Sequence, residues 1–264
     1  MKNGIIIRNI VDLRAKPVFN SERKSQLLYN EPVKIENNRG GYFRVIQPDG
    51  YSGWVNENAV QILSGAKLRK YQATLDFRVK SQKAKVKTPI KTKSNVPDFL
   101  FYGTNLASVR SEGNFHNMID FENNRFKISK SKLESIKISK LIKPSDIIKE
   151  AKKFLGVPYL WGGISPFGFD CSGFVRTIYR NFNIELFRDS RDQCKNGKKI
   201  ALNNIKPADL LFFKGHVAIV IGKNKFIHAS LGEGGVAINS LNPNDDIFRK
   251  DLFDTYLGAR RVLL

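Results

Sequence analysis

The stretch GFDCSGFVRTIYRNF, residues 168–182, decides the fold of the C-terminal half of the chain. Its apolar residues recur at steps of three and four, the period of an amphipathic helix. They are Phe174, Val175, Ile178, Tyr179 and Phe182. Cys171 falls in the first turn of this predicted helix, where free backbone N–H groups and the helix dipole stabilise a thiolate. The pattern therefore predicts a nucleophilic cysteine at a helix N-terminus.

Strands follow this helix. From Asp209 onward the apolar segments are DLLFFK, HVAIVIG, KFIHA, VAINS and YLGARRVLL. A cysteine-bearing helix followed by an antiparallel sheet is an α+β arrangement. An earlier amphipathic helix, with Ser145 as its N-cap and Gly156 at its end, opens this part of the chain. We expect one domain over residues 144–264.

Two of the three histidines lie in neighbouring predicted strands. His216 opens one strand and His228 lies in the next, with a short GKNK turn between them. Antiparallel neighbours can place His228 so that it orients the His216 imidazole, which would deprotonate Cys171. Two other interpretations stay open. Each histidine could be a hydrogen-bonded residue of the sheet, or the three groups could bind zinc, although no fourth ligand is evident. His116 is assigned a structural role.

The N-terminal half is β-rich. From Ile5 to Leu63, short alternating segments are separated by turn signals, which predicts a small all-β barrel. Hairpin turns are expected at 37–41 and 48–50, where Gly and Asn supply positive φ. Residues 66–143 are β-rich again and predict a second, diverged barrel.

Charge is concentrated in that second barrel. Lys and Arg total 45 against 24 Asp and Glu, a net charge of +21, and residues 66–143 hold 18 basic and 6 acidic side chains. One stretch contains no acidic residue. Its basic residues are Arg78, Lys80, Lys83, Lys85, Lys87, Lys91 and Lys93. We interpret it as a solvated strand edge blunted by charge rather than a specific polyanion site. Contact with an anionic polymer stays open, and nucleic-acid binding is not required.

The chain has no apolar run long enough for a membrane span, and its opening residues do not form a secretory signal. We expect a cytoplasmic protein, with a secreted or periplasmic location as the alternative if a signal peptide has been removed. Two cysteines are too few for a disulfide framework. Cys194 is expected to be an incidental thiol.

The segments PYLWGG, GFDCSGFV, GHVAIVIG and FIHAS together resemble the NlpC-type family, papain-like cysteine peptidases that cut bacterial cell-wall peptides. The resemblance covers residues 144–264. It implies that Cys171 is the nucleophile, His216 the general base and His228 the third polar residue. It also implies that Tyr159 and the Cys171 N–H form the oxyanion site. No metal or organic cofactor is implied.

The segments VDLRAKP, EPVKI, GYFRV and GYSGWV, within residues 1–65, resemble a bacterial SH3-like domain. Two SH3-like barrels, 1–65 and 66–143, before a papain-like domain resemble the γ-D-glutamyl-L-diamino-acid endopeptidases of murein recycling. The implied substrates are murein tripeptides or tetrapeptides with a free N-terminal L-alanine. The alternatives are a secreted hydrolase of intact peptidoglycan and a non-catalytic wall-binding protein.

The same resemblance implies a set of substrate contacts. They are Asp170, Ser172, Ser190, Glu31 and Tyr51. A buried ammonium must meet carboxylates and hydroxyls, so the first barrel would act as a gate that excludes peptides with a blocked alanine amine. The neighbouring Arg188, Asp189 and Asp192 are interpreted as a solvated turn without a chemical role.

Overall fold

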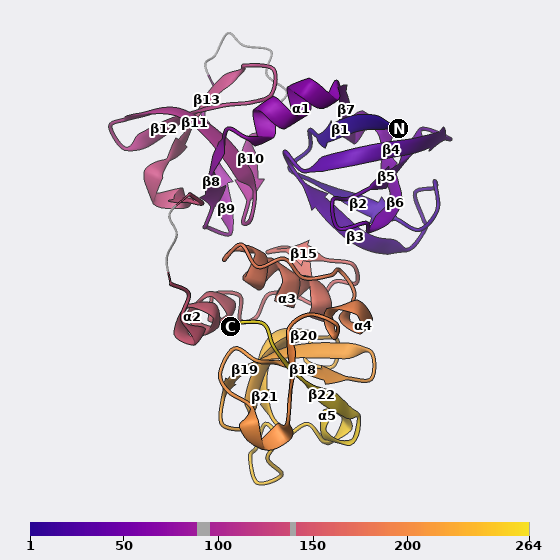
Figure 1. Ribbon diagram of the computed structural model, residues 1–264, viewed down its shortest axis with the longest axis vertical. Helices are drawn as coiled ribbons and strands as arrows, with labels where there is room; N and C mark the ends of the chain where they lie inside the picture. Colours follow the sequence, from indigo (N-terminus) through magenta and orange to yellow (C-terminus); the bar gives the residue numbers. More distant parts are fainter. Residues whose placement is uncertain (89–95, 138–140, 264) are drawn as a thin grey trace. The chain divides into compact units, whose positions relative to one another are not determined.

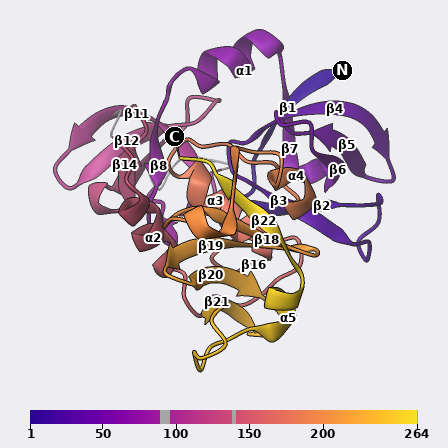
Figure 2. The ribbon, with the colours of Figure 1, turned by 60° about the horizontal axis from the view of Figure 1, so that its bottom comes forward.

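The computed structural model describes residues 1–88, 96–137 and 141–263. The chain forms two compact units, Met1–Ser139 and Lys140–Leu264. Figure 1 shows the ribbon coloured along the sequence, and Figure 2 shows it turned by 60°. The α+β class is confirmed, because few helices accompany mainly antiparallel sheets. The division of the first unit into two domains at residue 65 stays a prediction.

The first sheet of the first unit has seven strands in the order β3-β2-β6-β5-β4-β1-β7. The strands are β1 (Lys2–Ile6), β2 (Ile10–Arg14), β3 (Arg23–Leu28), β4 (Pro32–Arg39), β5 (Tyr42–Ile46), β6 (Ser52–Asn56) and β7 (Val60–Leu63). A single 3-10 turn, η1 (Glu57–Ala59), precedes β7. Alternate side chains such as Leu13, Val45 and Val55 form its core. The two predicted hairpin turns are confirmed, with positive φ at Gly40, Gly41 and Gly50.

A helix follows this sheet where only strands were expected. Helix α1 (Gly65–Gln72) is capped by Ser64, whose Oγ accepts a hydrogen bond from the Lys67 N–H at 3.2 Å. Its two buried residues, Leu68 and Tyr71, join an apolar cluster with residues of both sheets of this unit. Two apolar positions are too few to show helical periodicity, which explains why the sequence did not reveal α1.

The second part of this unit forms a five-stranded sheet, β13-β12-β11-β8-β14, and a separate pair, β10-β9. The strands are β8 (Leu75–Val79), β9 (Lys83–Lys85), β10 (Phe99–Phe101), β11 (Asn105–Glu112), β12 (Phe115–Ile119), β13 (Arg125–Ser129) and β14 (Leu133–Ser135), with the 3-10 turn η2 (Lys130–Lys132) before β14. Their core contains Leu106, Met118 and Phe126. His116 packs its ring 4.2 Å from that of Phe77, in keeping with a structural role.

The basic stretch lies partly on β9. The Lys83 ammonium lies 3.9 Å from the ring centre of Phe99, and the Lys87 ammonium lies 4.5 Å from that of Phe115. These cations therefore contact aromatic faces while remaining at the surface. Lys91 and Lys93 lie outside the described residues.

The second unit contains a six-stranded antiparallel sheet in the order β17-β22-β18-β19-β20-β21. Its elements are α2 (Pro144–Lys152), β15 (Ile164–Ser165), β16 (Gly168–Phe169), α3 (Cys171–Arg180), α4 (Ser190–Gln193), β17 (Lys198–Ile200), η3 (Leu202–Asn204), β18 (Leu210–Phe213), β19 (His216–Gly222), β20 (Lys225–Ser230), β21 (Gly235–Ser240), α5 (Lys250–Asp254) and β22 (Tyr256–Arg261). The cysteine helix and the five predicted strands are confirmed. The short elements β17, α4 and α5 were not predicted.

The start of α2 differs from the prediction. The N-cap is Lys143 rather than Ser145, and the Lys143 N–H donates to Asp146 Oδ2 at 3.1 Å. Pro144 takes the first helical position, where its missing N–H costs nothing. The helix ends at Lys152, and Gly156 adopts a positive φ of 79° in the turn beyond it.

Helix α3 packs on β19 and β20, as Figures 1 and 2 both show. The approach of α3 to the chain before β15 needs a glycine at position 173. A Cβ on Gly173 would lie 2.1 Å from the carbonyl oxygen of Gly163, so the chain before β15 can approach α3 only when residue 173 has no side chain. The first turn of α3, with Cys171, thus lies directly against the chain before β15. Within the described residues, no helix is long and apolar enough to cross a membrane.

Candidate active site

Cys171 is the first residue of α3 and is 8% exposed. Burial raises the pKa of its thiol to about 11, with help from the nearby Asp170 carboxylate. Hydrogen bonds from the backbone N–H groups of Ser172 and Val217 lower that pKa but do not outweigh burial. The predicted stabilisation of the thiolate by the helix N-terminus is therefore too weak by itself. The thiol is protonated at neutral pH and needs a base.

The structure brings the two histidines of the sheet together, as predicted. His216 Nε2 lies 2.6 Å from His228 Nδ1, and His228 is fully buried. Burial is the main cause that lowers the pKa of His216 to about 3 and that of His228 to about 4. Both imidazoles are therefore neutral at neutral pH, the form in which a ring nitrogen can accept a proton. Val217, whose N–H meets the cysteine sulfur, directly follows His216.

Asn239 extends this pair and was not singled out from the sequence. Its Oδ1 lies 2.7 Å from His228 Nε2. Its Nδ2 donates to Glu233 Oε1 and to the Ile247 carbonyl oxygen, both at 3.3 Å. Two acceptors on the amide nitrogen fix the side-chain orientation, so its oxygen faces the imidazole. The sequence feature that could have pointed to Asn239 is its position as a polar residue inside the apolar VAINS strand.

This chain of contacts determines which nitrogens carry protons. Because Asn239 Oδ1 can only accept, His228 Nε2 donates, and Nδ1 of the neutral ring is an acceptor. His216 must then donate from Nε2 to His228, which leaves its own Nδ1 unprotonated. His216 thus has a free lone pair on Nδ1, as a general base requires.

Arg188 corrects the sequence interpretation of its segment as a solvated turn. The residue is 2% exposed, and its Nη2 lies 2.6 Å from Asp170 Oδ2. Its Nη1 donates to Asp170 Oδ1 at 3.1 Å and to Ser172 Oγ at 2.9 Å. A lone arginine in a polar segment shows no periodic signal of burial, so only the fold reveals this pair.

Asp170 and Ser172 are consequently engaged within the protein. Besides Arg188, the Asp170 carboxylate accepts hydrogen bonds from the N–H groups of Gly162 and Gly173, at 2.9 and 2.6 Å. The Ser172 hydroxyl lies 3.2 Å from Asp170 Oδ1. The carboxylate thus ties the loop before β15 to the first turn of α3. Direct contact of these two residues with a substrate amine stays a prediction.

Tyr159 lies near the thiol. Burial raises the pKa of its phenol to about 12, and the neighbouring Cys171 and Asp170 contribute. The phenol therefore stays protonated and can donate a hydrogen bond. The Cys171 N–H has no hydrogen-bond acceptor in the described part of the chain. These are the two donors predicted for the oxyanion site.

The other predicted contacts lie in separate places. Ser190 begins α4 and is half-buried. Glu31, in the first unit, is buried, and its Oε2 accepts from the Leu28 N–H at 3.1 Å. Tyr51, also in the first unit, has the Lys24 ammonium 4.7 Å from its ring centre. The gating role of Glu31 and Tyr51 stays a prediction.

Both cysteines are free thiols. The Cys194 thiol donates to the Arg191 carbonyl oxygen at 2.9 Å. Across 1–88, 96–137 and 141–263, no three or more His, Cys, Asp and Glu side chains gather as metal ligands would. Both nitrogens of His228 are already used in hydrogen bonds to protein groups.

Comparison with known proteins places this geometry in a family. Residues 156–254 match the model of the NlpC/P60 family, and residues 13–60 match that of the bacterial dipeptidyl-peptidase Sh3 domain. The chain is 32% identical over 260 residues to the gamma-D-glutamyl-L-lysine dipeptidyl-peptidase of Bacillus subtilis, covering 87% of this chain and 79% of that protein. It is 29% identical over 284 residues to dipeptidyl-peptidase 6 of Lysinibacillus sphaericus, covering 96% and 97%.

A solved structure agrees on the fold. The crystal structure of an NlpC/P60 family protein from Bacillus cereus aligns with a TM-score of 0.88 and 23% identity, covering 99% of this chain and 100% of that one. The likeness shows that the two chains share their overall fold.

Proposed function

Since the chain belongs to the NlpC/P60 family of cysteine peptidases, we propose that it hydrolyses the γ-D-glutamyl to L-diamino-acid bond of short murein peptides. The observation that carries this proposal is the hydrogen-bonded pair of His216 on β19 and His228 on β20, together with the N–H of Val217, next to His216, which meets the sulfur of Cys171. The relatives named above act, by their names, as dipeptidyl-peptidases and on γ-D-glutamyl-L-lysine. A dipeptidyl-peptidase of this kind would release L-Ala-γ-D-Glu.

The reaction follows from the protonation states. His216 Nδ1 takes the thiol proton of Cys171, and the thiolate attacks the γ-carbonyl carbon of D-glutamate. Tyr159 and the Cys171 N–H stabilise the oxyanion. The C–N bond then breaks as the His216 imidazolium gives its proton to the departing amine, which leaves a thioester on the sulfur. Water activated by the same imidazole hydrolyses the thioester and restores the thiol.

The free alanine amine is the second part of the proposal. Asp170 and Ser190 would receive the L-alanine ammonium and exclude peptides in which that amine is blocked, and Glu31 and Tyr51 stay contacts implied by the sequence resemblance. An ammonium that leaves water needs carboxylate or hydroxyl partners, so an acylated nitrogen would lose this interaction.

Mass spectrometry of the products tests three parts of the proposal together: which bond is cleaved, whether short murein peptides are substrates, and whether a free alanine amine is required. We expect L-Ala-γ-D-Glu from L-Ala-γ-D-Glu-L-Lys and from the diaminopimelate tripeptide, and little product from their N-acetylalanine forms. Equal cleavage of free and acetylated peptides would contradict the proposed requirement for a free alanine amine. Preferential release of peptides from intact sacculi would instead favour a wall hydrolase, and absence of any cleavage would favour a wall-binding protein.

We also propose that the basic second barrel contacts anionic polymers, because its net charge of +12 has few acidic partners. Retention on immobilised teichoic acid, lost on replacing Lys83, Lys85 and Lys87 by Gln, would support this contact. We propose a cytoplasmic location, which cell fractionation tests.

A further inference from the structure

A cavity of about 300 Å³ lies in the second unit, beside the loop that leads into His216. Its lining includes Gly215, which precedes His216, and Ser190, which begins α4. Phe212 and Phe213 contribute apolar lining. The cavity therefore reaches the residue before the proposed base, His216, and is built from residues that the catalytic steps do not use.

Three cations line this cavity. They are Arg191, Lys199 and Arg260, and no acidic residue is part of the lining. Among the residues that the structure describes, none of the three forms an ion pair. Asp192, which follows Arg191 in the sequence, is ion-paired with Lys195 at 2.5 Å, and the charge of Arg191 makes a smaller contribution to lowering the pKa of its carboxyl.

The positions of these cations are set by regular structure. Lys199 and Arg260 are direct partners across β17 and β22, so their side chains lie on the same face of the sheet. Arg260 is also the partner of Leu210 on β18. Arg191 comes from α4. Like charges held together repel, and a bound anion between them would remove that cost.

We propose that this cavity binds a carboxylate of the murein peptide, an inference that rests on the proposed function. Two carboxylates of an L-Ala-γ-D-Glu-diamino-acid tripeptide lie a few bonds from the scissile amide. One is the α-carboxylate of D-glutamate, and the other is that of the diamino acid. Guanidinium groups bind carboxylates through charged, directional hydrogen bonds. The apolar floor of the cavity strengthens such pairs by excluding water.

The test compares three tripeptides on the wild type and on Arg260→Gln and Lys199→Gln. One peptide has both carboxylates, one has the D-glutamate α-carboxamide, and one has the diamino-acid carboxamide. Loss of a charged hydrogen bond should raise KM about tenfold or more, with little change in kcat, because the cavity holds no reacting atom. With one of the two carboxamide peptides, the wild type and the variants should have the same KM. The carboxylate that this peptide lacks is then the one that the cavity binds.

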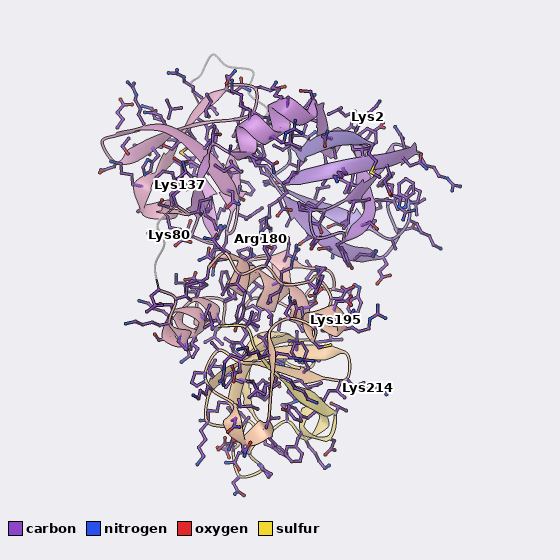
Figure 3. All side chains as sticks on the ribbon, in the orientation of Figure 1. Lys2, Lys80, Lys137, Arg180, Lys195 and Lys214 are labelled. Atoms are coloured by element: carbon purple, nitrogen blue, oxygen red, sulfur yellow. The ribbon has the colours of Figure 1, made fainter. Side chains whose placement is uncertain are left out.

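Lys214→Gln is the matched control. Lys214 precedes Gly215 but is not part of the cavity lining, and Figure 3 labels it in the second unit. An equal rise in KM from Lys214→Gln would mean that only the general positive field matters and would overturn the inference.

Binding measured by calorimetry on Cys171→Ala protein separates the inference from the proposed function. If wild type cleaves the tripeptide but neither KM nor binding depends on a carboxylate and Arg260, the cavity inference fails. If wild type cleaves no tripeptide while Cys171→Ala protein still binds it through one carboxylate and Arg260, the proposed function fails and the inference stands. Absence of both cleavage and binding contradicts both.

Discussion

At the scale of single residues, the proton arrangement at His216 depends on Asn239. The amide oxygen of Asn239 accepts from His228 Nε2, and the amide nitrogen has two acceptors of its own. The histidine pair also lies in the field of Glu233, Arg249 and Asp251. Since Arg249 is ion-paired to both carboxylates, these charges largely offset one another.

Replacing Asn239 should change the pH profile in a predictable direction. Asn239→Asp puts a carboxylate against His228 Nε2, and its negative charge raises the pKa of His228 and, by the same direct attraction, that of His216. Activity needs the neutral imidazole, so the acid limb of kcat/KM should move to higher pH.

Asn239→Leu should lower kcat at all pH values with little change in KM. Asn244→Asp, which adds the same charge in an exposed segment, should leave the profile unchanged; a shift there would refute the local explanation.

Arg188 and Asp170 form a buried ion pair whose two members depend on each other. Removing the cation alone leaves a buried carboxylate unpaired, so Arg188→Met should destabilise the second unit by about 3 kcal/mol. The double variant Arg188→Met, Asp170→Asn should recover part of that loss. Urea unfolding followed by Trp161 fluorescence in a Trp54→Phe background reports on this unit. A double variant less stable than Arg188→Met would contradict the argument.

At the scale of elements, the approach of the loop before β15 to α3 depends on Gly173. Gly173→Ala would bring a Cβ within 2.1 Å of a backbone carbonyl oxygen, so loop or helix must shift. Because the same turn of α3 carries Cys171, we expect kcat/KM to fall by about a hundredfold or more, since small misplacements of a reacting group are costly. Gly222→Ala, where a Cβ meets no atom within 4 Å, is the control and should retain activity. Normal activity of Gly173→Ala would show that the close approach is not needed.

The same elements show what a sequence can reveal. Helix α3 and strands β19 and β20 have clear apolar periods, so Cys171, His216 and His228 could be assigned to them. Helix α4 has only four residues, too few for a period. Arg188, just before it, therefore looked solvated although it is buried. The raised pKa of Cys171 could not be predicted from the sequence either, because burial depends on how the whole unit packs and not on one helix end.

At the scale of the whole molecule, most of the positive charge lies before residue 144, outside the predicted catalytic domain. Residues 66–143 hold +12 of the net +21, and residues 144–264 hold +6. The predicted catalytic groups Cys171 and His228 are instead buried and neutral, and beside them lie the paired Asp170 and Arg188. The first barrel is only mildly basic and supplies the predicted gate residues. Each part of the chain thus has its own electrostatic character.

The most direct test of the central claim is release of L-Ala-γ-D-Glu from L-Ala-γ-D-Glu-L-Lys, followed by mass spectrometry for the wild type and Cys171→Ala. We expect that the wild type releases the dipeptide and that Cys171→Ala releases none, while Cys194→Ser, the conservative control on the second free thiol, still releases it. Undiminished release by Cys171→Ala would contradict the account.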